Sequence, residues 1–148
     1  MPIFQSRYYS LPIEAGAAAG HAPADSTRYY IGNTGTINPG STTPNGFECI
    51  APEDGIVRRV FFVAQMLAGT TPSTNVSTVA LYVNGSPAAT LSNGFPMSSV
   101  LNTLANDTVA VPIRQMDRVE IQISTPTWST NPTVVFYRGA LVVESGQR

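Results

Sequence analysis

The sequence predicts an all-β protein: an antiparallel β-sandwich, a jelly roll of about eight strands, preceded by an extended N-terminal arm. Three observations predict this fold. Charged residues make up only 11% of the chain and lysine is absent, whereas surface helices need charged residues on their wet face. Val, Ile, Thr, Tyr and Phe are frequent, and they suit a pleated, half-buried surface. Twelve glycines and twelve prolines interrupt the chain at short intervals, as in a protein with many turns.

The length of 148 residues indicates one domain with an arm. Residues 1–27 contain three prolines and a run of alanine and glycine, and we find no lasting strand or helix period in them. We therefore expect an extended arm over 1–27 and the sandwich over 28–148. A chain of this size can bury a core without disulfides or metals.

Alternation of apolar and polar residues marks the strands. It is clearest over 118–124, where Val119, Ile121 and Ile123 alternate with polar residues, which predicts one dry and one wet face. The Asn84-Gly85 pair predicts a tight hairpin. Residues 92–107 fit either a helical turn or a strand with a loop. The other expected strands are 28–31, 47–50, 56–66, 78–84, 87–91, 108–113 and 133–144.

Two of the expected strands, 56–66 and 133–144, are apolar on both faces. A two-layer sandwich buries only one face of each sheet, so the second face needs another cover. We expect that cover to be a second subunit, in a homotrimer, with the arm folding back as the alternative. The residues assigned to this subunit interface are Phe61, Val63, Phe136 and Val142.

The arm carries its own apolar residues, which would be anchors on a neighbouring subunit or another protein. Arg7 could pair there with an acidic group. The partner-binding residues assigned to the arm are Ile3, Phe4, Arg7, Tyr8, Tyr9, Leu11 and Ile13.

Charge and hydropathy exclude several classes of partner. The net charge is −1 and the eight arginines are not clustered, which argues against nucleic acid. No apolar run approaches the roughly 18 residues of a membrane span, and the N-terminus has no signal-peptide pattern. We therefore expect neither nucleic acid nor membrane as a partner, and synthesis in the cytoplasm.

Catalytic and metal-binding groups are scarce. His21 is the only histidine and lies in the arm, a poor place for an oriented base, so we expect it at solvent or an interface. Cys49 is the only cysteine and reads as a small core residue. We predict no catalytic residue, no cofactor and no metal, and hence no enzyme. Trp128 in a polar loop, together with Tyr82, could stack on a sugar, although a loop tryptophan more often covers the end of a sandwich or anchors an interface.

Two turn-and-strand motifs resemble a known group of proteins. They are Ala-Pro-Glu-Asp-Gly-Ile-Val at 51–57, and Thr-Val-Ala-Val-Pro-Ile at 108–113 followed by Asp-Arg-Val-Glu-Ile at 117–121. Such patterns are similar to those of small viral jelly-roll modules: decoration (cement) proteins and fibre or knob proteins of tailed bacteriophages, and, more loosely, trimeric C1q/TNF-like heads. The resemblance covers about residues 47–66 and 108–144. It departs at Met116, where such modules often have glycine before the aspartate.

The resemblance implies a structural virion protein, which decorates and stabilises a capsid by binding the outer surface of the major capsid protein shell. Its expected location is then the virion surface. The alternative is a carbohydrate- or receptor-binding head of a viral fibre or tail.

Overall fold

The structure, a computed structural model, describes residues 6–15, 21–33, 49–68, 75–97 and 100–146. These residues form ten strands and no helix, and so they contain no helix that could cross a membrane. The strands are β1 (Arg7–Ala15), β2 (Arg28–Ile31), β3 (Cys49–Ile50), β4 (Gly55–Ala68), β5 (Ser77–Val83), β6 (Ser86–Phe95), β7 (Leu101–Asn106), β8 (Val111–Ile113), β9 (Arg118–Ser124) and β10 (Val134–Ser145).

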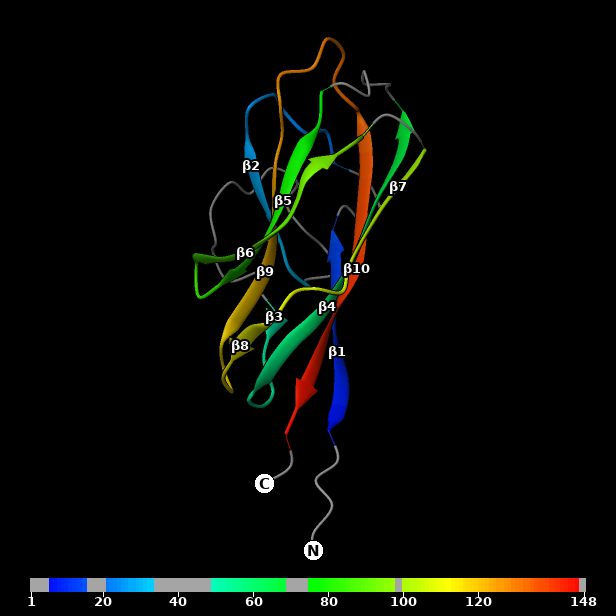
Figure 1. Cartoon of the computed structure of the whole chain (residues 1–148). Coiled ribbons are helices and arrows are strands. Elements are labelled where there is room, and N and C mark those ends of the chain that lie inside the picture. The colour runs from blue at the N-terminus through cyan, green and yellow to red at the C-terminus, as the bar shows by residue number, and fades with distance from the viewer. Residues whose placement is uncertain (1–5, 16–20, 34–48, 69–74, 98–99, 147–148) are drawn as a thin grey trace, which may run out of the picture.

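The strands form two antiparallel sheets, which pack face to face (Figure 1). One sheet, called here the β1 sheet, has the order β1-β10-β4-β7, with β8 also paired to β4. The other, the β2 sheet, has the order β2-β9-β5-β6, with β3 also paired to β9. The pairs are nested: β1 with β10, β2 and β3 with β9, β4 with β7 and β8, and β5 with β6. A long antiparallel ribbon rolled into two sheets in this way is a jelly roll, so the predicted fold class is confirmed.

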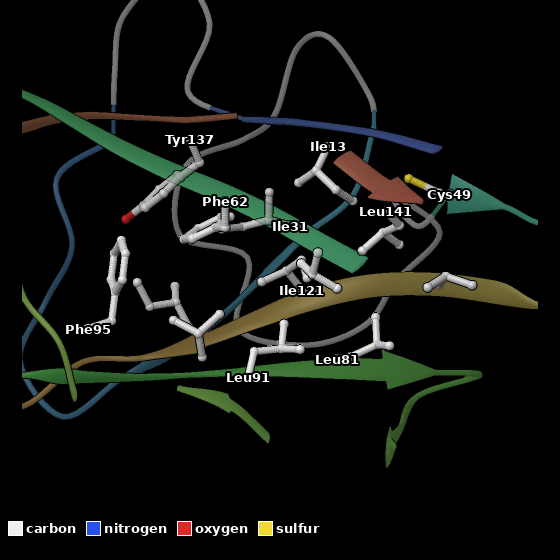
Figure 2. Packing of buried hydrophobic residues seen from close by; sticks show 14 of the residues in the cluster. Ile13, Ile31, Cys49, Phe62, Leu81, Leu91, Phe95, Ile121, Tyr137 and Leu141 are labelled. Atoms are coloured by element: carbon white, nitrogen blue, oxygen red, sulfur yellow. The ribbon is translucent and has the colours of Figure 1, made fainter. Parts of the chain in front are cut away.

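The core lies between the two sheets and is built from alternate residues of each strand. Figure 2 shows Phe62 and Tyr137 of the β1 sheet above Leu81 and Ile121 of the β2 sheet. The rings of Phe62 and Tyr137 stack with their centroids 5.9 Å apart, and Phe95 lies 5.5 Å from Phe62. This aromatic cluster is buried between the two sheets.

The expected extended arm over 1–27 is wrong, because residues 7–15 form β1, the edge strand of the sandwich. β1 pairs with β10 over its whole length, from Arg7 opposite Ser145 to Ala15 opposite Tyr137. Leu11 and Ile13 are 8% and 2% exposed, so they are core residues and not anchors for a partner. The sandwich therefore begins at residue 7 instead of 28.

The rest of the described arm also belongs to the sandwich. His21 exchanges two backbone hydrogen bonds of 2.8 Å with Val135 of β10, and Asn131 donates to the Pro23 carbonyl at 3.2 Å. His21 is only 5% exposed, so the expectation of a solvent or interface side chain is wrong. Among the other expected anchors, Ile3 and Phe4 lie outside the described residues.

Two local predictions are settled by the backbone. Asn84 and Gly85 have φ of 51° and 78°, the left-handed pair that a two-residue hairpin of this type requires, and they join β5 to β6 as predicted. In the ambiguous stretch 92–107 the strand alternative is correct, because β6 continues to Phe95 and β7 follows from Leu101.

Candidate interaction surface

The two long strands β4 and β10 present one face to the core and the other away from it, as the sequence predicted. Their core side chains are at most 3% exposed: Val60, Phe62, Ala64, Met66, Val135, Tyr137, Leu141 and Val143. The alternating residues point outward from the β1 sheet. We call Phe61, Val63, Phe136 and Val142 the outer apolar face; Phe61 is exposed and the other three are half-buried.

Phe61 stands at the centre of this face. On β4 it lies between Ala140 of β10 and Ala105 of β7, its direct cross-strand partners. Both neighbours are small, so the ring projects above them and keeps 43% of its surface exposed. The next outward-facing residue along β4, Val63, lies opposite Arg138 of β10. Exposed aromatic side chains and arginines are enriched in protein–protein contacts.

Two more exposed apolar residues extend this surface. Leu101 on β7 lies opposite Gln65, which is also the partner of Phe136, and it is 56% exposed. Tyr8 near the start of β1 lies opposite Glu144 of β10 and is 63% exposed. Sequence reasoning did not assign Leu101, because the pattern over 92–107 favours no single structure. From the sequence, Tyr8 was expected in the extended arm, but it lies in β1 and is therefore part of the sheet.

Arginines line one end of the surface. The pairing of β4 with β10 shifts between Val142 and Val143, and this β-bulge leaves Arg58 as the extra residue on β4. Arg58 then forms an ion pair with Glu144, with Nε 2.6 Å from the carboxylate. The Ser6 hydroxyl and the Arg58 guanidinium hold the pKa of Glu144 below its ordinary value.

A shallow hollow of about 590 Å³ lies beside this bulge. Its lining includes Tyr8, Arg59, Asp107 and Val142, so it combines an aromatic ring, an aliphatic side chain and both signs of charge. It adjoins the outer apolar face at Val142 and continues that surface toward the start of β1 and the end of β10.

The opposite side of the molecule carries a polar cluster, next to the exposed side chain of Ile50. On the outer side of the β2 sheet, the Gln122 amide donates to the hydroxyls of Tyr30, at 2.9 Å, and Tyr82, at 2.8 Å. The two rings meet edge to face with centroids 5.3 Å apart. Glu120 was expected on a solvent-facing side but is only 2% exposed, and the large side chain of Tyr82 on β5 lies directly opposite it.

The proposed stacking pair of Trp128 and Tyr82 is not assembled. Trp128 is only 5% exposed, and its indole nitrogen donates to the Asn75 carbonyl at 3.2 Å. Asn75 precedes β5 and Tyr82 lies near the far end of that strand. Trp128 therefore covers one end of the sandwich, and a sugar platform that includes it is wrong.

The two residues that could act as base or nucleophile are both buried. His21 Nδ1 lies 3.1 Å from the Tyr137 hydroxyl, and burial lowers the pKa of His21 to about 4. The Cys49 thiol faces the Pro12 carbonyl at 3.1 Å, and burial, followed by the Glu120 charge, raises the pKa of Cys49 to about 12. The core interpretation of Cys49 is confirmed. The described residues contain no group of three His, Cys, Asp or Glu side chains that could hold a metal ion.

No protein-family model matches the chain, and no curated protein matches it. The two outer sides of the sandwich differ in composition. The outer apolar face is formed by the long strands β4 and β10, while the outer side of the β2 sheet carries hydrogen-bonded polar groups.

Proposed function

We propose that this chain is a structural protein that decorates and stabilises a viral capsid from its outer surface, as a homotrimer and without chemistry of its own. The observation that carries the proposal is the outer apolar face, with Phe61 at its centre and 43% exposed. Contiguous exposed apolar patches with polar residues at their edge mark protein–protein interaction sites. The viral assignment and the trimer rest on the resemblance of the turn motifs to capsid-bound jelly rolls.

Attachment would come from burial of apolar surface, repeated by symmetry. Fully burying a large apolar side chain contributes about 1.5–3 kcal/mol, and Phe61, Phe136 and Leu101, each already partly covered, would each contribute a part of that. Arg59 and Arg138 are exposed beside them and would select a partner with acidic groups at its rim. Copies held together as a trimer bind the shell at several points, so weak single contacts add up to firm attachment.

Self-association tests the role of the outer apolar face directly. Sedimentation velocity at micromolar concentration should show a trimer for the natural chain and a monomer for Phe61→Asp, because a charge left unpaired in a dry contact costs several kcal/mol. Phe136→Asp should behave in the same way. Thr78→Asp is the matched control: it is exposed on the outer side of the β2 sheet and should stay trimeric. A natural chain that sediments as a monomer would refute the trimer.

The position of the chain in a virus particle tests decoration separately. Gold-labelled antibodies against the chain should decorate the heads of intact particles in electron micrographs. Labelling confined to the far end of the tail would contradict decoration and favour a fibre head.

A receptor- or sugar-binding head is the second candidate, and the Tyr30–Tyr82 pair favours it. These rings form an aromatic corner on the polar side of the molecule, with the Gln122 amide between their hydroxyls. Glycan-array binding that is lost in Tyr82→Ala and kept in Phe61→Asp would support this role in place of decoration.

A further inference from the structure

Two exposed asparagines in the described part of the chain are followed by glycine, Asn84 at the hairpin turn and Asn93 near the end of β6. Asparagine is thermally labile, and most so before glycine, because no Cβ crowds the glycine nitrogen that can attack the side-chain amide carbon. Such an attack requires that the amide can turn toward that nitrogen. The surroundings of each amide therefore decide whether it reacts. The third pair of this kind, at 45–46, lies outside the described residues.

The Asn84 side chain is held through both atoms of its amide. Its Oδ1 accepts the Arg118 N–H at 2.9 Å, and its Nδ2 donates to the Asp117 carboxylate at 2.8 Å. A hydrogen bond to a charged group is stronger than a neutral one. The amide must give up both bonds before its carbon can meet the Gly85 nitrogen, so the turn holds this asparagine away from the reaction.

Asn93 and Gly94 lie instead at an irregular point of β6. Thr78 of β5 faces both of them, so β6 has one extra residue at this position. Such a β-bulge leaves the extra residue outside the regular ladder. Among the described strands β6 is the edge strand of its sheet, with β5 as its neighbour. The backbone here is thus less constrained than in a central strand.

The groups that would react are also accessible. Among the described residues, none holds the exposed Asn93 amide by a hydrogen bond. The Gly94 N–H donates to the Ser92 hydroxyl at 3.2 Å, at the long end of the usual range. A Cβ built on Gly94 would meet nothing within 4 Å, so the space around the Gly94 nitrogen is open. Rotation of the Asn93 side chain can therefore bring its amide carbon to this nitrogen.

We propose that Asn93 is a site of spontaneous deamidation, while the fold protects Asn84. The Gly94 nitrogen bonds to the side-chain amide carbon of Asn93, the bond from that carbon to Nδ2 breaks, and ammonia leaves with the Gly94 proton. A cyclic imide remains. Water opens it and returns a proton to the Gly94 nitrogen, which leaves aspartate, or isoaspartate where water attacks the backbone carbonyl carbon. Either product adds one negative charge to a chain whose net charge is −1.

Peptide mapping of the folded chain, kept at neutral pH and sampled over days, measures both sites. Chymotrypsin cleaves after Tyr82, Leu91 and Phe95, and so places the two asparagines on separate peptides, 83–91 and 92–95. Mass spectrometry should find aspartate and isoaspartate accumulating in peptide 92–95. Asn84 should react about thirtyfold more slowly, the factor that corresponds to about 2 kcal/mol for its two side-chain hydrogen bonds.

Two controls separate the fold from the local sequence. In guanidinium chloride, where Asn84 loses its partners, both asparagines should react at similar rates. Gly94→Ala crowds the attacking nitrogen and should slow the reaction at Asn93, while the melting temperature stays the same because the new Cβ meets open space. The proposal is overturned if Asn93 in the folded chain reacts no faster than Asn84, or if their difference persists in guanidinium chloride. It is also overturned if Gly94→Ala deamidates at Asn93 as fast as the natural chain.

Discussion

The buried imidazole of His21 makes the stability of this protein sensitive to mild acid. The ring is 5% exposed and lies edge-on to Tyr29, with centroids 4.4 Å apart, and Nδ1 faces the Tyr137 hydroxyl at 3.1 Å. Nε2 meets no hydrogen-bond partner among the described residues. Burial disfavours the positive charge of a protonated ring and lowers the pKa of His21 to about 4.

The sign and size of the effect follow from proton linkage. An unfolded histidine titrates near 6.5, so below that pH the unfolded chain binds a proton that the folded chain excludes. Stability therefore falls as the pH drops from 6.5 to about 4 and levels off below that. At about 1.4 kcal/mol per pH unit, His21 alone lowers the free energy of unfolding by about 2.5 kcal/mol between pH 7.5 and pH 4.5.

Urea unfolding at pH 7.5 and pH 4.5, at one protein concentration, measures this loss. His21→Gln is the matched variant: its amide oxygen can accept from Tyr137, but it cannot titrate. Carboxylates such as Glu144, whose pKa is lowered by the Ser6 hydroxyl and by Arg58, lose their stabilisation at lower pH and do so equally in both proteins. The natural chain should lose about 2.5 kcal/mol more than the variant. Equal losses in the two proteins would refute the reasoning.

Two further substitution experiments examine the sheet itself. Gly139→Ala should unfold the protein or lower its free energy of unfolding by several kcal/mol, because the new Cβ would overlap the Phe61 carbonyl oxygen. The control Gly94→Ala places its Cβ in open space and should change the free energy of unfolding by less than about 0.5 kcal/mol. Equal melting temperatures for the two variants would contradict the close approach of Gly139 to β4. Deleting residues 1–14 should abolish cooperative unfolding, because it removes most of β1 together with the buried Leu11 and Ile13. Burial of each of these two side chains contributes about 1.5–3 kcal/mol to stability. If circular dichroism shows that the deletion variant is folded, β1 is dispensable.

The fold could be predicted because its signals are local. Alternation over β9 and the Asn84-Gly85 turn each specify a strand or a hairpin within a few residues. β1 was missed because Pro12 lies between Leu11 and Ile13, and a proline argues against a strand even where Tyr9, Leu11 and Ile13 alternate with other residues. Proline is tolerated there because β1 is an edge strand, bonded on one side to β10 only.

The candidate surface was predicted in part, because a strand that is apolar on both faces has one face outside the core, and this can be seen without knowing which strands lie beside it. What the sequence could not show is which residues join across strands. Phe61 gains its prominence from Ala105 and Ala140, which lie 44 and 79 positions further along the chain and become neighbours only through strand register. The burial of His21 and Trp128 likewise depends on contacts between distant segments, His21 with Tyr137 and Trp128 with Asn75.

Cryo-electron microscopy of intact particles tests the central claim most directly, because it shows both where the chain lies and which side it buries. The account predicts jelly-roll density outside the capsid shell, with the outer apolar face around Phe61 covered by a neighbouring protein and the Tyr30–Tyr82 side toward solvent. Density placed at a tail tip, or on the shell with Phe61 facing solvent and the Tyr30–Tyr82 side buried, would contradict it.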